Sequence, residues 1–121
     1  MTATGHTVET QPTDQHIRIE VDGEVVAESR NAVALHETGM PTRWYLPVDD
    51  VRAEVLRPSD FHSHCPFKGE ASYHHVVTAA DKHSDLVWFY PEPIAGVEAI
   101  RGRLAFYNEK VTVFVDGEPE A

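Results

Sequence analysis

Cysteine and long apolar runs are what this 121-residue sequence has least of. Cys65 is the only cysteine, so no disulfide can form within the chain, and a free thiol fits the reducing cytoplasm, where we expect the protein. No apolar run approaches the roughly 20 residues that span a bilayer, and the amino terminus lacks the basic and apolar blocks of a signal peptide. We therefore expect no membrane partner.

Basic side chains are also scarce, because 10 lysines and arginines stand against 20 acidic residues and the formal net charge is −10. Such a charge repels a phosphate backbone, so we expect no nucleic-acid partner. The sequence also lacks a phosphate-binding glycine-rich loop, a Gly-x-Ser-x-Gly elbow, a dinucleotide-binding fingerprint and a metalloprotease helix. These absences disfavour the familiar enzyme classes.

The residues that are present suffice for one domain. Hydrophobic residues make up 41% of the chain, which is ordinary for a globular protein. Residues 1–15 are rich in threonine and have almost nothing large and apolar to bury, so we expect a flexible N-terminal arm that is dispensable and outside the site. The acidic tail at residues 118–121 is expected to fray, which leaves residues 16–117 as a single domain.

The patterning of this domain is that of β-structure. Residues 17–21 alternate apolar and charged side chains, and the Asp22-Gly23 pair that follows is typical of a tight hairpin turn. Further short runs rich in β-branched and aromatic residues bring the expected number of strands to about eight. Helical signals are limited to one turn after Pro47 and one before Gly102. The sequence therefore predicts a mainly β fold with one or two short helical turns.

Chemically distinctive residues gather in three segments, "ETGMPTRWYLP" (37–47), "HCPFKGEASY" (64–73) and "WFYPEP" (88–93). Each combines proline or glycine, which fix unusual backbone paths, with polar or aromatic side chains, as loops that carry sites often do. We expect the three segments to meet at one pocket.

Side-chain alternation selects the residues of this pocket. In an extended segment Arg43 and Tyr45 point to one side, and likewise Trp88 and Tyr90. Basic and aromatic side chains together describe a small, partly apolar ligand site. We expect its ligand-binding residues to be Arg43, Tyr45, Tyr73, Trp88 and Tyr90. Two structural alternatives stay open: the arginine pairs with Glu37 or Asp49 to fix a loop, or the aromatic pair fills the angle between two sheets.

Cys65 and Lys68 are the candidate catalytic residues. An ammonium close to a thiol favours the thiolate, which attacks electrophiles, and Gly69 permits the sharp turn that would bring the lysine back to the sulfur. Alternatively, Cys65 is a small buried hydrophobe, as unpaired cysteines commonly are. Phe106 and Tyr107 are assigned to the core and the partner strand.

Four motifs in order, "ETGxPxRxY", "CPxKGxAxY", "WxYPxP" and "GxxAFY", resemble the bacterial family called domain of unknown function 427. This resemblance covers about residues 21–117 and implies a β-tent, or Mss4-like, fold in which two small antiparallel sheets pack at a steep angle. It implies no reaction. Other proteins with that fold often hold zinc through paired Cys-x-x-Cys motifs, which this sequence lacks.

A zinc site here would need His62, His64 and Cys65 with His74 or His75. We disfavour it, because the side chains of the adjacent pair 64–65 tend to diverge and structural zinc usually takes two ligand pairs. We expect no metal and no cofactor.

These observations favour a domain that binds a small molecule, with an anionic group in the ligand to match Arg43 and Lys68. Whether Cys65 and Lys68 also catalyse a reaction stays open. The alternative is a protein-interaction or homodimerisation module that presents its aromatic strand to a partner.

Overall fold

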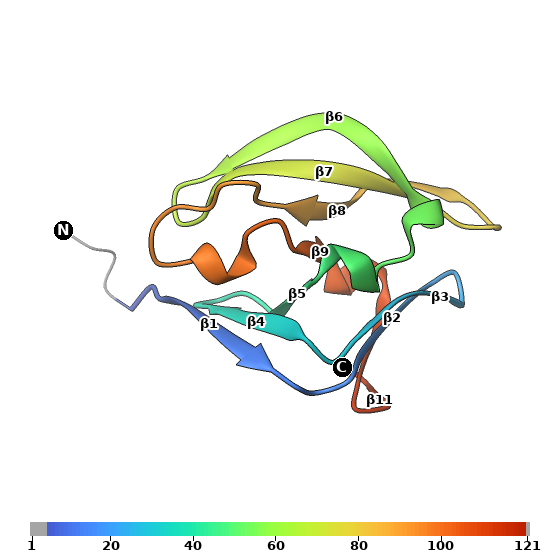
Figure 1. The fold of residues 1–121 in the computed structure, drawn as a ribbon, viewed down its shortest axis with the longest axis horizontal. Coiled ribbons are helices and arrows are strands. Elements are labelled where there is room, and N and C mark those ends of the chain that lie inside the picture. Colours follow the sequence, from blue (N-terminus) through green and yellow to red (C-terminus); the bar gives the residue numbers. More distant parts are fainter. Residues whose placement is uncertain (1–4, 121) are drawn as a thin grey trace.

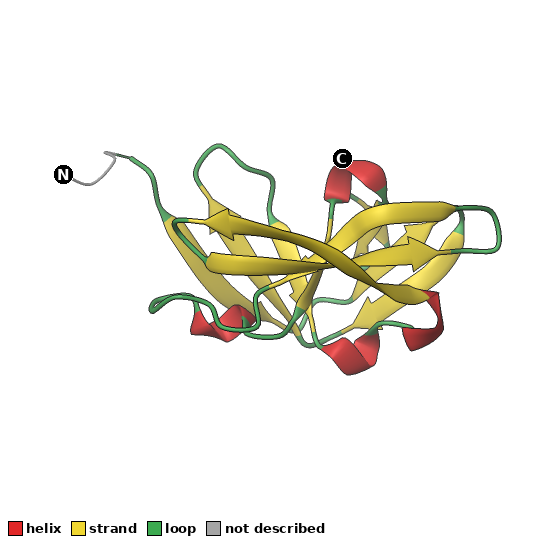
Figure 2. Ribbon diagram, turned by 90° about the horizontal axis from the view of Figure 1, so that it is seen from above, coloured by secondary structure: helices red, strands yellow, loops and turns green. Residues whose placement is uncertain are grey.

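The computed structural model describes residues 5–120, and in this range the chain forms eleven strands and four short 3-10 helices. The strands are β1 (Val8–Thr13), β2 (Ile17–Val21), β3 (Glu24–Ser29), β4 (Ala32–Glu37), β5 (Arg43–Leu46), β6 (Leu56–Cys65), β7 (Gly69–Val77), β8 (Lys82–Phe89), β9 (Leu104–Phe106), β10 (Thr112–Val115) and β11 (Glu118–Pro119). The 3-10 helices are η1 (Val48–Asp50), η2 (Ala53–Val55), η3 (Glu98–Ile100) and η4 (Asn108–Lys110). Figure 2 shows that these turns lie at the margins of the strands.

The strands form two antiparallel sheets, so the mainly β fold is confirmed. The larger has seven strands in the order β1-β4-β5-β9-β8-β7-β6, and the smaller has four in the order β11-β10-β2-β3. In Figure 1 strands β6, β7 and β8 arch over β1, β4 and β5, and the segment around η3 (orange) lies between them. The two helical turns expected after Pro47 and before Gly102 are η1 and η3.

The expected hairpin is the β2–β3 connection. Its Asp22 and Gly23 both adopt left-handed backbone angles, with φ of 55° and 76°. This is the conformation in which the turn twist matches the strand twist. The second Val-Asp-Gly-Glu sequence makes the same kind of turn between β10 and β11, where Asp116 has φ of 51°.

Both chain ends differ from what the sequence led us to expect. Residues 8–13 form β1, which pairs along its whole length with β4 from Val8 opposite Glu37 to Thr13 opposite Ala32. Backbone hydrogen bonds hold such an edge strand without an apolar pattern, which explains why the threonine-rich sequence suggested a free arm. The expected tail instead forms β11 against β10. Residues 1–4 and 121 lie outside the described residues.

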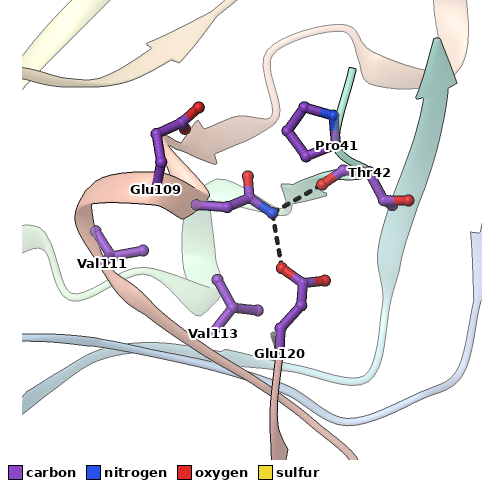
Figure 3. Close-up of a pocket in the computed structure, with 7 residues that line it drawn as sticks. Pro41, Thr42, Glu109, Val111, Val113 and Glu120 are labelled. Carbon is purple, nitrogen blue, oxygen red and sulfur yellow. Dashed lines mark hydrogen bonds between the residues drawn. The ribbon is translucent and has the colours of Figure 1, made fainter. Parts of the chain in front are cut away.

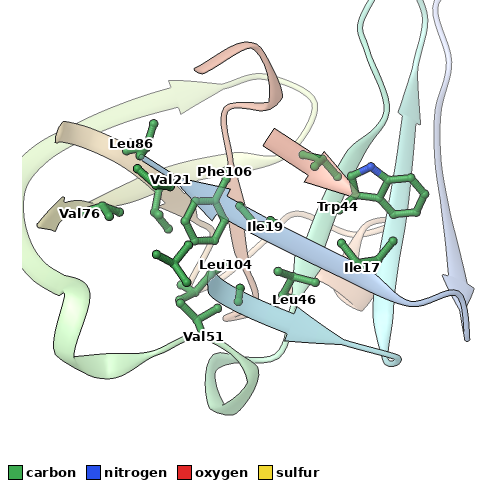
Figure 4. Packing of buried hydrophobic residues seen from close by; sticks show 14 of the residues in the cluster. Ile17, Ile19, Val21, Trp44, Leu46, Val51, Val76, Leu86, Leu104 and Phe106 are labelled. Carbon is green, nitrogen blue, oxygen red and sulfur yellow. The ribbon is translucent and has the colours of Figure 1, made fainter. Parts of the chain in front are cut away.

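The main core lies between the two sheets (Figure 4). The smaller sheet contributes the inward positions of its alternating strands, among them Ile17, Ile19 and Val21, which are at most 2% exposed. The larger sheet packs Trp44 and Leu46 of β5 against them, together with side chains of β8 and β9. The β5 alternation is therefore the predicted one, and it leaves Arg43 and Tyr45 on the opposite face. None of the helical turns in residues 5–120 is long or apolar enough to cross a membrane.

A second cluster lies on that opposite face of the seven-stranded sheet. Strands β4, β5, β7, β8 and β9 supply most of it, and the segment around η3 adds Val97 and Ile100. Its aromatic members are Tyr45, Tyr73, Trp88 and Tyr90. The arched sheet thus places four of the five expected ligand-binding residues in one body of packed side chains.

Candidate functional site

A cavity of about 160 Å³ opens beside this second cluster. Strands β4, β5, β7 and β8 and the turns that follow β4, β6, β8 and β9 supply its walls. Its lining residues are Glu37, Met40, Arg43, Tyr45, Lys68, Tyr73, Trp88, Tyr90 and Tyr107. The structure therefore brings together all five residues expected to bind a ligand, and Lys68 with them. We call this cavity the tyrosine pocket, because all four tyrosines of the chain line it.

Three phenols of the tyrosine pocket, those of Tyr45, Tyr90 and Tyr107, have a raised pKa and stay uncharged at physiological pH. Burial raises the pKa of Tyr45 and of Tyr90 far above the ordinary value, and it raises the pKa of Tyr107 to about 12. A neutral phenol is both a hydrogen-bond donor and an acceptor. These three side chains therefore offer hydroxyl groups to the pocket rather than negative charge.

The tyrosine hydroxyls differ in whether they already have hydrogen-bond partners within the protein. Tyr45 is fully buried, and its oxygen accepts a 3.0 Å hydrogen bond from Nε1 of Trp88, whose ring it meets edge-on. The hydroxyls of Tyr73 and Ser63 are 2.8 Å apart. Among residues 5–120 no partner bonds the hydroxyl of Tyr90, although this side chain is 5% exposed. This oxygen is not among the buried polar atoms that lack a partner, so it is accessible from the cavity that Tyr90 lines and can bond a ligand there.

Arg43 forms one cationic wall of the tyrosine pocket. The residue is 8% exposed, and its guanidinium carbon lies 5.2 Å from the centre of the Trp88 ring and 5.8 Å from that of Tyr107. Nη1 and Nη2 donate to the two carboxylate oxygens of Glu109 at 2.7 and 3.3 Å, and Nη1 also donates to Asn108 at 2.9 Å. These bonds lower the pKa of the Glu109 carboxyl. The loop partner of Arg43 is therefore Glu109, not Glu37 or Asp49 as the sequence suggested.

Lys68 forms the other cationic wall, and it also differs from expectation. Its ammonium does not turn back to Cys65 but lies 2.5 Å from Oε1 of Glu37, at the end of β4. The hydrogen bond between the two residues is a backbone one: the Lys68 amide donates to the Cys65 carbonyl at 3.1 Å. A carboxylate is a stronger partner for an ammonium than a thiol, so the local sequence spacing did not decide the direction of the side chain.

Cys65 lies beside the tyrosine pocket without lining it. It ends β6 opposite Gly69, is partly buried and packs against the second cluster. The residues that line the pocket in the described part of the chain do not include it. The packed-thiol alternative thus agrees better with the structure than a thiol activated by Lys68.

The histidines near Cys65 disperse instead of converging. His62 is bonded to Ser72, His64 pairs with Glu70 at 2.7 Å and His75 pairs with Asp85. His74 stacks on Phe89, and burial lowers its pKa. Within residues 5–120 no three His, Cys, Asp or Glu side chains stand close enough together to hold a metal ion.

A larger cavity of about 420 Å³ lies on the far side of Asn108 and Glu109 (Figure 3). Its polar groups are bonded to one another: the Asn108 amide donates to the Thr42 carbonyl at 2.8 Å and to Glu120 at 2.9 Å. The other Glu120 oxygen accepts from Nε1 of Trp44. This network fixes the loops behind Arg43, whereas the smaller tyrosine pocket keeps donors available. We therefore assign the site to the tyrosine pocket.

Sequence reasoning missed three pocket residues, Glu37, Met40 and Tyr107. The first two lie inside a segment that was singled out, but only for its arginine and tyrosine. Tyr107 follows Phe106, which is buried in the main core. Alternation places the next side chain on the other face, and that signal was available in the sequence.

Fold and site together define a class: an open two-sheet β protein with an aromatic pocket held by two ion pairs. The comparison with known families refines this class, because the family described as "Domain of unknown function (DUF427)" matches residues 9–117. The chain belongs to this family, as the four motifs implied. Among curated proteins, none matches the chain.

Proposed function

We propose that the protein binds a small molecule with an anionic group in the tyrosine pocket. The observation that carries the proposal is the convergence of all four tyrosines with Arg43 and Lys68, from segments far apart in the sequence, on one cavity. At about 160 Å³ it is smaller than the roughly 300–1,000 Å³ of sites for drug-sized ligands, so the ligand is small.

The chemistry of the walls argues against a cationic ligand. The aromatic faces of Trp88 and Tyr107 that attract a cation already meet the guanidinium of Arg43. The Lys68 ammonium and the Tyr90 hydroxyl can both donate hydrogen bonds to a ligand, and the walls around them are mostly aromatic. A carboxylate on a flat ring would accept these bonds and pack its ring against the aromatic walls.

A titration with three ring compounds of one shape tests the proposal: benzoate, neutral benzamide and cationic benzylammonium. The chain has two tryptophans, which make a built-in control in NMR spectra of the indole N–H groups. The Trp88 indole lies in the pocket wall, whereas that of Trp44 is bonded to Glu120 elsewhere. We expect benzoate to shift the Trp88 signal saturably and to leave the Trp44 signal in place.

The Lys68→Met variant should weaken benzoate binding, and Lys82→Met, which removes an exposed lysine at the start of β8, should not. If benzamide or benzylammonium binds as well as benzoate, or if Lys68→Met folds and binds benzoate as the unaltered protein does, the anionic part of the proposal is wrong. Catalysis through Cys65 and Lys68 stays a separate prediction. Incubating native protein with iodoacetamide checks it, since a thiol that reacts only after denaturation is packed.

An exposed apolar rim favours the second candidate, a protein-interaction or homodimerisation module. Met40, Phe67 and Ile94 are 49%, 42% and 42% exposed. Met40 lines the tyrosine pocket, Phe67 precedes Lys68, and the Ile94 amide bonds to the Lys68 carbonyl. Exposed apolar groups around a cavity are typical of contact surfaces. Light scattering of the protein and of Phe67→Ser over a range of concentrations tests whether this rim self-associates.

We also propose a cytoplasmic, bacterial protein with a β-tent architecture. The single unpaired cysteine supports the location, and the two-sheet fold and the family support the rest.

A further inference from the structure

His6 lies against the tyrosine pocket, in the segment that the sequence suggested was a loose arm. Its Nε2 is 3.3 Å from Oε2 of Glu37, and its ring stacks on Phe67 with centroids 4.2 Å apart and planes 26° apart. Glu37 is the ion-pair partner of Lys68, and Phe67 precedes Lys68 in the chain. Figure 1 shows the start of β1 and the β6–β7 turn at the same end of the molecule.

Hydrogen bonds to Thr38 fix the position of His6. The Thr7 amide donates to the Thr38 hydroxyl at 2.8 Å, and the Thr38 amide donates to the Thr7 carbonyl at 3.1 Å. The same hydroxyl donates to the Gly5 carbonyl at 2.9 Å. The residues on both sides of His6 are therefore tied to the neighbour of Glu37.

The Glu37 carboxylate faces two nitrogen groups, with Oε1 on the Lys68 ammonium and Oε2 on the His6 ring. Nε2 of His6 is buried, and within residues 5–120 it has no hydrogen-bond partner of good geometry. With this unfavourable geometry a neutral imidazole gains little from the carboxylate, whereas an imidazolium forms an ion pair with it. Within residues 5–120 the other charged or titratable groups that line the pocket with Glu37 and Lys68 are Arg43 and the four tyrosines, and Cys65 lies near Tyr45 and Tyr90.

We infer that His6 belongs to the binding site, and that an anion binds by taking Lys68 over from Glu37, whose carboxylate then pairs with protonated His6. This inference rests on the proposed binding of an anion. Charge balance supports the exchange. Before binding, one carboxylate and one ammonium cancel. The bound anion adds one negative charge, and the proton that His6 takes up from solvent cancels it, so the buried group stays neutral.

The exchange makes binding depend on pH in one direction. A proton taken up on binding makes the complex tightest at low pH and weaker as pH rises through the range where histidine titrates. Uptake of one full proton weakens the affinity by at most about tenfold per pH unit. We expect the affinity for benzoate, which stays ionised throughout, to be roughly tenfold higher at pH 5.5 than at pH 8.

The experiment measures the dissociation constant of benzoate from the Trp88 indole signal between pH 5.5 and 8 in four proteins. The unaltered chain should show the tenfold change, and His6→Gln should show nearly none. His16→Gln is the matched control, because His16 also pairs with a glutamate, at 2.9 Å, and its side chain is 25% exposed against 26% for His6. It should keep the full pH dependence.

Glu37→Gln is the fourth protein, and it frees Lys68 permanently. Its benzoate affinity should match that of the unaltered protein at pH 5.5 and stay constant to pH 8. The inference is overturned if a folded His6→Gln keeps the original pH profile, or if benzoate binds the unaltered protein equally well at every pH. Absence of any benzoate binding at any pH instead refutes the proposed function, and the exchange with it. The dispersion of each spectrum shows whether the variant is folded.

Discussion

Replacing Tyr45 by phenylalanine should destabilise the protein through a single lost hydrogen bond. The side chain is fully buried and its oxygen accepts the 3.0 Å bond from Nε1 of Trp88. Tyr45→Phe removes that acceptor and changes the packing volume little. The indole N–H, on a side chain only 6% exposed, then loses its partner.

The loss in free energy of unfolding depends on whether the Trp88 N–H group gains another hydrogen-bond partner. A buried donor left without a partner costs about 1–3 kcal/mol. The adjoining tyrosine pocket is polar and open enough to admit water, which restores part of the bond, so we expect the lower half, about 1–2 kcal/mol. For a chain of this length that corresponds to a fall in melting temperature of roughly 3–8 °C.

Urea denaturation followed by circular dichroism measures this free energy without relying on tryptophan emission. Tyr107→Phe is the control, because Tyr107 lines the same pocket and is only partly buried. It should cost less than about 0.5 kcal/mol, as surface substitutions do. A Tyr45→Phe cost as small as that of the control would refute the reasoning. A double-mutant cycle with Trp88→Phe isolates the bond, and its coupling energy should account for most of the loss.

Three further predictions concern the frame of the site. Deleting residues 1–13, which removes β1 and His6, should lower the melting temperature by several degrees and abolish the pH dependence of benzoate binding, as thermal unfolding and the NMR titration would show. Gly69→Ala should cost about 1–3 kcal/mol in urea denaturation, because φ at this position is +115° and an added Cβ would lie 3.3 Å from the Glu92 carbonyl oxygen. Hydrogen bonds from His83 and then Thr78 lower the pKa of Asp22. Its contribution to the free energy of unfolding is therefore complete above the ordinary carboxyl range and is lost as pH falls through the lowered pKa. In acid titrations of stability, Asp22→Asn should therefore show a smaller loss of free energy of unfolding below pH about 4 than the unaltered protein.

The sequence predicted those features that local chemistry decides. The hairpin at Asp22-Gly23 follows from the backbone freedom of the pair, and the facing of Arg43 and Tyr45 follows from the two-residue period of a strand. The family motifs located the segments that build the tyrosine pocket. These signals need no knowledge of which strands are neighbours.

What the sequence left undetermined depends on partners far along the chain. Nothing near Lys68 shows that its ammonium meets Glu37, 31 residues away, or that Arg43 meets Glu109, 66 residues away. Strand β1 was missed because an edge strand is held by backbone bonds to β4, which carry no side-chain pattern. The role of His6 was hidden for the same reason.

The pairing of β2 with β10 has a consequence for how the chain folds during synthesis. Ile17 lies opposite Val115, so the four-stranded sheet joins strands that are far apart in the sequence of the domain. Contacts this distant in sequence carry a high cost of loop closure and form slowly. While the ribosome is still making the chain, β2 can pair with β3 but not yet with β10. The four-stranded sheet therefore stays incomplete until β10 has emerged, and we expect chains that stall or are cut before β10 to be unfolded and prone to aggregation.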